Sequence, residues 1–214
     1  MTGKARGSEI DTVTDWLVGG GDTGDLIRSM DWSATPLGPR ESWPNALRVM
    51  TNVALSSTFA MAILWGKELI FIYNDAYAAI AGHRHPGAMG RSARAVWPEV
   101  WEFHKPVLDK VMNEGQTVHL EDQPFRIMRQ GRITDAYSTL SYSPIRADDG
   151  SIGGTLVTLI ETTERERIER ELRITQFSVD RSAVAIFWIG PDARLLYVND
   201  MTCRALGYSR EELL

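Results

Sequence analysis

The sequence has very little cysteine: Cys203 is the single one in 214 residues. One thiol excludes an internal disulfide framework and a cysteine-rich zinc site. No apolar run approaches the roughly 20 residues that a membrane-spanning helix needs, and the first residues lack the apolar segment of a signal peptide. Lys and Arg number 23 against 28 Asp and Glu, so the chain has no excess of cations for a nucleic-acid backbone. These absences predict a cytoplasmic protein, or the cytoplasmic part of a longer one, with no membrane span and no nucleic-acid partner.

Tryptophan is the residue type that stands out, with 7 in the chain. The overall composition, 43% hydrophobic and 24% charged, is ordinary for a globular protein. Each indole ring buries a large apolar area, so packing is the first explanation for the tryptophans. An aromatic ligand pocket is the alternative. The seven are Trp16, Trp32, Trp43, Trp65, Trp97, Trp101 and Trp188.

Apolar periodicity and turn residues predict two strands, then short helices, then more strands. Asn74 ends the second strand and offers a cap to the helix that follows. Asp149-Gly150 is the strongest two-residue hairpin signal. Strands grouped in this way predict an α+β fold with an antiparallel sheet and helices on one face. We expect helices at 44–56, 76–81, 91–97 and 99–113, and strands at 59–65, 69–73, 117–120, 125–129, 133–142 and 152–160.

An internal repeat runs through the chain. Ala62-Ile63-Leu64-Trp65 recurs as Ala185-Ile186-Phe187-Trp188 at an offset of 123, while Asn74-Asp75 recurs as Asn199-Asp200 at an offset of 125. The alignment places a two-residue insertion in the turn between the strands. A period of this length indicates tandem domains. Residues 182–214 are therefore expected to be the start of a second, incomplete domain.

The first repeat resembles a PAS domain, of a subfamily found ahead of bacterial sensor kinases. The closing Glu161-Thr162-Thr163-Glu164-Arg165 looks like the family's Asp-x-Thr junction, with Glu161 where Asp is usual and with Thr163 and Arg165 as further junction residues. The other marks are Asp31-Trp32-Ser33, Thr35-Pro36-Leu37-Gly38-Pro39, Trp43-Pro44, Trp65-Gly66, Tyr73-Asn74-Asp75-Ala76-Tyr77, Gly82 and His85-Pro86.

The resemblance implies a five-stranded antiparallel sheet in the order 2-1-5-4-3, with a cavity between the sheet and its helices. It also implies an output helix that acts on a downstream kinase or another effector. The expected organisation is an N-terminal extension and helical cap at 1–56, a PAS domain at 57–162, a linker helix at 163–181 and the second PAS start at 182–214.

The expected linker helix is highly charged, with eight charged residues among the ten from Glu164 to Arg173. A solvated single helix is one interpretation. However, Ile168, Leu172, Thr175 and Val179 follow one another at intervals of 4, 3 and 4 residues, which is the spacing of a coiled-coil seam. We therefore expect a homodimer that pairs through this helix.

Aromatic and polar residues that could line a cavity occur on the predicted strands and helices. Along 135–142, alternation puts Tyr137 and Thr139 on one face and Tyr142 on the other, without showing which one faces the helices. The same residues could also fill the core and leave no room for a ligand. The candidate ligand-binding residues are Trp65, Tyr73, Tyr77, Trp97, Trp101, His104, Tyr137, Thr139 and Tyr142.

No metal or catalytic site is expected. His83 and His85 lie in one loop with no third ligand nearby, and loop polarity explains them. His104 lies on the long helix from which haem-binding PAS domains supply their axial ligand, but a hydrogen-bonded core histidine is the simpler interpretation. Flavin-adduct chemistry is not expected, because Cys203 lies in the early helix of the second repeat. No other cofactor is indicated.

The sequence thus predicts the sensory and dimerisation region of a bacterial signalling protein, a histidine kinase, which binds a small molecule and signals through a dimeric linker helix. A PAS scaffold without a ligand and a haem-based gas sensor using His104 are the alternatives.

Overall fold

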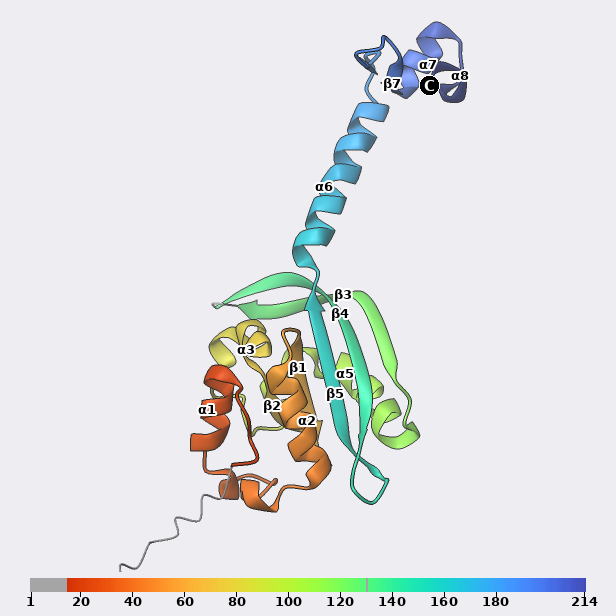
Figure 1. Ribbon diagram of the computed structural model, residues 1–214. Coiled ribbons are helices and arrows are strands. Elements are labelled where there is room, and N and C mark those ends of the chain that lie inside the picture. The colour runs from red at the N-terminus through yellow and green to blue at the C-terminus, as the bar shows by residue number, and fades with distance from the viewer. Residues whose placement is uncertain (1–14, 130) are drawn as a thin grey trace, which may run out of the picture. The chain divides into compact units, whose positions relative to one another are not determined.

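The computed structural model describes residues 15–129 and 131–214, which form two compact units divided between Glu161 and Thr162 (Figure 1). Residues 1–14 of the expected cap and Gln130 of the expected turn lie outside the described residues. We call residues up to Glu161 the first unit and residues from Thr162 the second unit.

The first unit contains a five-stranded antiparallel sheet in the order β2-β1-β5-β4-β3, which confirms the expected order. Tight turns join β1 to β2 and β4 to β5, with Gly150 at a φ of 84° in the second turn. The two short strands expected at 117–120 and 125–129 are one strand with an irregularity between Leu120 and Gln123. The strands are β1 (Ala60–Trp65), β2 (Ile70–Tyr73), β3 (Val118–Arg129), β4 (Arg132–Arg146) and β5 (Ile152–Glu161).

Strand register divides the side chains between two faces of the sheet. Leu64, paired with Thr155, lies on what we call the inner face, and Trp65, paired with Gly154, lies on the outer face. The inner face is covered by the connection from β2 to β3. Its segments are α3 (Asp75–Ala81), η3 (Gly82–Arg84), α4 (Ala93–Val96), η4 (Pro98–Val100), α5 (Trp101–Asp109) and the π-helical η5 (Lys110–Glu114).

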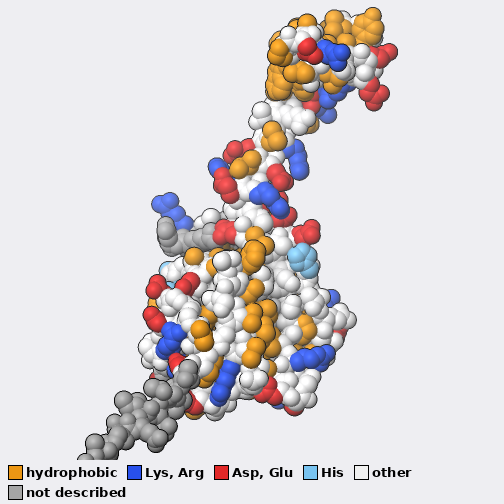
Figure 2. All heavy atoms as spheres, in the orientation of Figure 1, with side chains coloured by type: hydrophobic (Ala, Val, Ile, Leu, Met, Phe, Trp, Pro, Cys, Tyr) orange, Lys and Arg blue, Asp and Glu red, His pale blue; other side chains and the backbone are white. Residues whose placement is uncertain are grey.

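The N-terminal segments lie against the outer face of β1 and β2, so helices flank the sheet. Leu47 of α2 approaches Trp65 and Ile70, both of which have outer-face register. Beside α2, a band of hydrophobic side chains remains visible on this side of the unit (Figure 2). The segments are α1 (Gly21–Ser29), η1 (Trp32–Ala34), η2 (Arg40–Ser42) and α2 (Asn45–Ser56).

Two tryptophan rings form the core of this cap. Trp32 and Trp43 are each 2% exposed, and their rings meet edge to face with centroids 4.7 Å apart. The indole N–H of Trp32 donates to the Ile27 carbonyl at 2.8 Å, and that of Trp43 donates to the Gly38 carbonyl at 3.1 Å. Because both donors are satisfied, the rings can be buried without an unpaired polar group. The proline-containing stretch is therefore organised around the two rings.

The second unit begins with the expected linker helix, α6 (Thr163–Asp180), and continues with a hairpin and two helices. Asn199 caps α7 by accepting from the Thr202 amide, as Asn74 caps α3 by accepting from the Tyr77 amide. The further elements are β6 (Phe187–Ile189), β7 (Leu195–Val198), α7 (Asp200–Leu206) and α8 (Arg210–Leu213).

The strand pairing supports an offset of 125 as far as Trp188, and the offset of 123 expected for the first strand is wrong. Ala62 pairs with Tyr73 in the first unit, and Phe187 pairs with Val198 in the second. The pairing of Ile63 with Ile72 likewise recurs 125 residues later. Sequence identity between two short apolar runs predicts a shift of two residues, but the pairing shows only an irregularity between Trp188 and Ile189.

With this offset, α6 corresponds to α2. The Asn74 side-chain amide donates to the carbonyl of Ala54 at 3.0 Å, and that of Asn199 donates to the carbonyl of Val179 at 3.0 Å. The seam of α6 therefore corresponds to a set of apolar residues in α2 and just before it. Ile168, Leu172, Thr175 and Val179 are equivalent to Trp43, Leu47, Met50 and Ala54, respectively.

Replacing Trp43 by alanine should lower the free energy of unfolding of the first unit by about 3–5 kcal/mol, because a fully buried ring leaves a cavity. Trp188→Ala serves as the matched control, since Trp188 is 61% exposed and its loss should change stability little. Urea denaturation of both variants measures the difference. Equal midpoints for Trp43→Ala and the parent would contradict the role of the ring.

Candidate functional site

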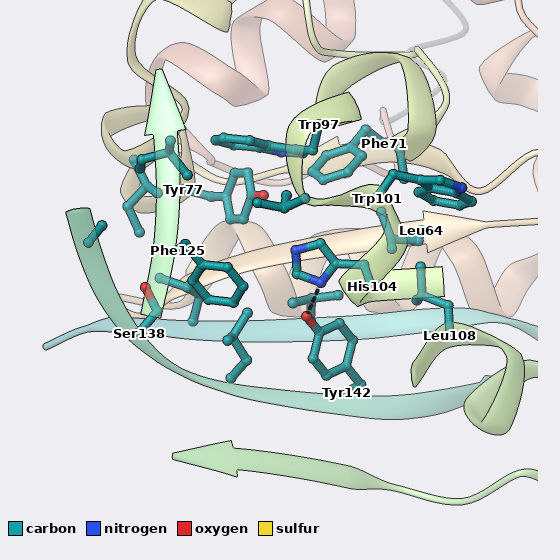
Figure 3. A pocket seen from close by; sticks show the side chains of 18 residues that line it. Leu64, Phe71, Tyr77, Trp97, Trp101, His104, Leu108, Phe125, Ser138 and Tyr142 are labelled. Atoms are coloured by element: carbon teal, nitrogen blue, oxygen red, sulfur yellow. Dashed lines mark hydrogen bonds between the residues drawn. The ribbon is translucent and has the colours of Figure 1, made fainter. Parts of the chain in front are cut away.

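A cavity of about 70 Å³ lies between the inner face of the sheet and the helices that cover it (Figure 3). No Lys, Arg, Asp or Glu is among its described lining residues, so the wall is apolar apart from a few uncharged polar groups. These residues are Leu64, Phe71, Tyr77, Ile80, Ala93, Trp97, Val100, Trp101, His104, Leu108, Phe125, Ile127, Ala136, Ser138, Leu140, Tyr142, Val157 and Leu159.

Local structure explains which side chains reach the cavity. On α5, Trp101, His104 and Leu108 are separated by three and four residues, so they share one side of the helix. On β4, alternate residues face inward, and the register puts Leu140 opposite Leu159 and Tyr142 opposite Val157 of β5. The structure thus settles which face of β4 lines the cavity.

A hydrogen bond between Tyr142 and His104 joins the sheet to α5 across the cavity. The Tyr142 hydroxyl lies 2.6 Å from His104 Nδ1, and Phe125 stacks on the imidazole with ring centroids 5.6 Å apart. Burial lowers the pKa of His104 to about 4 and raises the pKa of Tyr142 above its ordinary value. Both groups are therefore uncharged at neutral pH.

A second polar pair, Tyr77 and Trp97, lies on the helical side of the cavity. Among the described residues, none accepts a hydrogen bond from the buried indole N–H of Trp97. This N–H is near enough to the Tyr77 hydroxyl to lower its pKa in part, although burial raises that pKa more. The Arg84 guanidinium covers the Trp97 ring at 4.1 Å from its centroid and forms an ion pair with Glu99.

Five of the nine candidate ligand-binding residues line the cavity: Tyr77, Trp97, Trp101, His104 and Tyr142. The other four lie elsewhere. Trp65, Tyr137 and Thr139 have outer-face register, opposite Gly154, Pro124 and Ile160 respectively.

Tyr73 lies on the inner face of the sheet but does not line the cavity, because its side chain contacts other residues. Its hydroxyl lies 3.1 Å from His85 Nδ1, and its ring packs beside Phe71 and Tyr77. Burial raises the pKa of Tyr73 to about 12.

Sequence reasoning missed the apolar majority of the lining, such as Leu64, Phe125, Leu140 and Val157. In the sequence these residues look like any buried strand residue. Leu140 could have been identified, because it lies two residues from Tyr142 on β4 and so shares its face. The lining residues on other strands depend on the pairing register, which the sequence does not show. The lining is thus set mainly by contacts between distant segments.

The described residues contain no group of three or more His, Cys, Asp or Glu side chains that could hold a metal ion. His85 is instead beside the Tyr73 hydroxyl, and Cys203 lies in α7 of the second unit. A porphyrin is much larger than a 70 Å³ cavity, so the residues around His104 do not fit haem. No helix in the described part of the chain combines the length and apolar character needed to span a bilayer.

The neutral state of His104 should make stability depend on pH. The unfolded chain takes up a proton on this imidazole near pH 6.5, whereas the folded chain does so near pH 4. Between these values the unfolded state binds more protons, so stability should fall as pH falls, by at most about 1.4 kcal/mol per pH unit. Urea denaturation at pH 7, 6 and 5 should show a smaller loss for His104→Gln than for the parent. His119→Gln is the control for loss of an exposed imidazole, and equal losses in His104→Gln and the parent would contradict the prediction.

Comparison with known proteins found similar solved structures and one matching family model. One similar solved structure is an RNA-binding light-oxygen-voltage receptor, with 21% identity and a TM-score of 0.45. The match covers 67% of this chain and 40% of that receptor chain. Another is the PAS domain of BvgS from Bordetella pertussis, with 20% identity and a TM-score of 0.46, where the match covers 62% of this chain and 97% of that chain. A third is a sensory box sensor histidine kinase from Vibrio cholerae, with 16% identity and a TM-score of 0.38, where the match covers 53% of this chain and 86% of that chain. No curated protein matches the chain. A family model described as the PAS fold matches residues 55–167, more than half of the chain, and the chain therefore belongs to the PAS fold family.

Proposed function

We propose that this chain is the sensory region of a bacterial signal-transduction protein, a cytoplasmic histidine kinase, whose first PAS domain binds a small molecule. The observation that carries the proposal is the cavity under α5, which holds the Tyr142–His104 hydrogen bond and the Trp97 N–H without an acceptor. Protein interiors are close-packed, and a domain that served only as a scaffold would gain stability by filling this space. The kinase assignment is supported by the sequence marks of the subfamily, such as Asp31-Trp32-Ser33 and Trp43-Pro44.

The signal would leave through β5 and α6. Val157 and Leu159 of β5 line the cavity, and α6 begins at Thr163, two residues after β5 ends at Glu161. A change in the cavity can therefore reach the start of the helix along one strand. The proposed junction residues Glu161, Thr163 and Arg165 lie at this transition.

We propose further that α6 pairs with α6 of a second copy in a parallel homodimer. Ile168 is 53% exposed and Leu172 is 66% exposed, and no residue of α6 is buried. The charged residues pair along the helix, for example Arg167 with Glu164 at 2.6 Å and with Glu171 at 3.7 Å. These pairs leave the apolar stripe open to a partner, which would stabilise a helix that has little tertiary support.

The ligand-binding part is tested by thermal denaturation against a library of small neutral molecules. A compound that binds the folded state and not the unfolded state raises the Tm of the parent. Ser138→Phe, which places a ring at the cavity wall, should abolish that rise, while Ser141→Phe on the outer face should keep it. An unchanged response in Ser138→Phe, or no compound that raises the Tm of the parent, would favour the scaffold without a ligand.

The dimer is tested by Leu172→Glu, which puts like charges at the centre of the stripe. Light scattering at several concentrations should show a dimeric parent and a monomeric or much weaker variant, with the first unit still folded. Ile174→Glu is the matched control, because Ile174 is equally apolar and 59% exposed but lies off the seam. A parent that is monomeric throughout, or a Leu172→Glu variant that dimerises like the control, would show that α6 is not the dimer interface.

A further inference from the structure

The cavity holds two ring N–H groups that can donate to a ligand, those of Trp97 and His104, beside the hydroxyls of Tyr77 and Ser138, which can donate or accept. Figure 3 shows Tyr77 and Trp97 on the same side of the cavity as the His104 ring nitrogen that is not bonded to Tyr142. Trp97 is 9% exposed, and its N–H lies near the Tyr77 hydroxyl but forms no hydrogen bond with it or with any other described residue. An unpaired buried donor destabilises a protein, so this N–H has a strong tendency to bind an acceptor brought in by a ligand.

The second donor follows from the tautomer of His104. Tyr142 is 1% exposed, and within the described chain its hydroxyl has His104 Nδ1 as its hydrogen-bond partner. If the neutral imidazole carried its proton on Nδ1, the Tyr142 hydrogen would be left without an acceptor. With the proton on Nε2, the Tyr142 hydroxyl donates to Nδ1 and the Nε2–H donor faces the cavity.

The cavity also excludes charge. Its described lining contains no basic side chain to neutralise an anion and no carboxylate to neutralise a cation. Moving an unpaired charge into such an environment is strongly unfavourable. A neutral molecule with an acceptor oxygen or nitrogen meets both requirements at once.

Size sets a further limit. The cavity volume of about 70 Å³ is about half of the 150 Å³ of an engineered cavity that takes up benzene. It is also well above the volume that one water requires. A molecule of a few heavy atoms, or the acceptor-bearing end of a larger one, fits without rearrangement.

We propose that the first PAS domain recognises a small neutral molecule through a carbonyl or a comparable hydrogen-bond acceptor, which receives hydrogen bonds from Trp97 Nε1 and His104 Nε2. This inference rests on the proposed sensory function and names the ligand class of its cavity. The Tyr77 hydroxyl adds a third polar group at the same place, while the apolar lining contacts the rest of the ligand.

Four probes of the same planar, branched shape and size test the proposal: acetone, isobutene, acetate and acetamidinium. Acetone and isobutene differ by an oxygen in place of a CH₂ group, and the other two carry a negative and a positive charge. Titration is followed in ¹H–¹⁵N spectra by the indole N–H signal of Trp97, which Trp97→Phe assigns, and by the methyl signals of the cavity wall. Acetone should shift the indole signal in a saturable way, and isobutene should bind at least about fivefold more weakly, the loss expected for one missing hydrogen bond. Acetate and acetamidinium should also bind more weakly than acetone, because the cavity lining offers no opposite charge.

Variants separate recognition from simple filling of space. Trp97→Phe should weaken acetone binding about fivefold, whereas Trp65→Phe on the outer face should leave it unchanged. If isobutene binds as tightly as acetone, or Trp97→Phe binds acetone like the parent, the acceptor class is wrong while the sensory function still stands. If none of the probes perturbs the cavity, the inference is overturned, and the compound library alone decides the sensory function.

Discussion

The side-chain amide of Asn74 holds together the place where the cap, the sheet and α3 meet. It donates to the carbonyls of Ala54, Ser57 and Phe59 at 2.8–3.1 Å and accepts from the amides of Met61 and Tyr77 at 3.0 Å. Asn74 is 1% exposed, so these bonds form in a medium where unpaired groups destabilise the fold. One side chain thus fixes the end of α2, the start of β1 and the start of α3. Because α2 is held at the outer face and α3 at the inner face, the cavity lies between the inner face and the helices from α3 to α5.

The cavity depends on this arrangement and adds a polar contact of its own. His104 comes from α5 and Tyr142 from β4, 38 residues later, so their hydrogen bond joins the helical layer to the sheet. Burial keeps both groups uncharged at neutral pH, and the lining offers no charged group to change that. A ligand in such a site would be selected by its shape and by the direction of its hydrogen bonds. His104 is placed by α5, and Trp97 lies at the junction between α4 and η4.

Much of the fold could be predicted from the sequence, because the strand signals and the resemblance to PAS domains fix the order of the sheet. The buried tryptophans of the cap and the capping role of Asn74 follow from local chemistry in the same way. Which face of β4 lines the cavity could not be predicted, since alternation defines two faces and long-range pairing decides between them. The position of Trp65 could not be predicted for the same reason. It lies two residues from Ile63, which pairs with Leu156 on the outer face, so Trp65 also points away from the cavity. The sequence predicts the wrong offset for the first strand of the repeat for a related reason, because two short apolar segments can be aligned in more than one register.

The corrected offset changes how α6 is understood. Its apolar stripe stands at the positions by which α2 packs on its own sheet, and its C-terminal end is bonded within the second unit. Asp180 accepts from the Tyr197 hydroxyl at 2.6 Å and from Arg210 at 2.8 Å, and Asn199 holds the carbonyl of Val179. The helix is therefore a structural part of the second unit as well as the continuation of β5.

A stripe with this periodicity can pack on a sheet or pair with an identical helix, and the sequence pattern is the same for both. The two helices differ in exposure: Leu47 of α2 is completely buried, whereas Leu172 at the equivalent position of α6 is 66% exposed. Since the C-terminal end of α6 is fixed by side chains of β7 and α8, a partner bound to the exposed stripe would act on those elements through a helix that is already attached to them. If α6 pairs as proposed, pairing would therefore be physically coupled to the structure of the second unit, which is what a helix that transmits a signal between two domains requires.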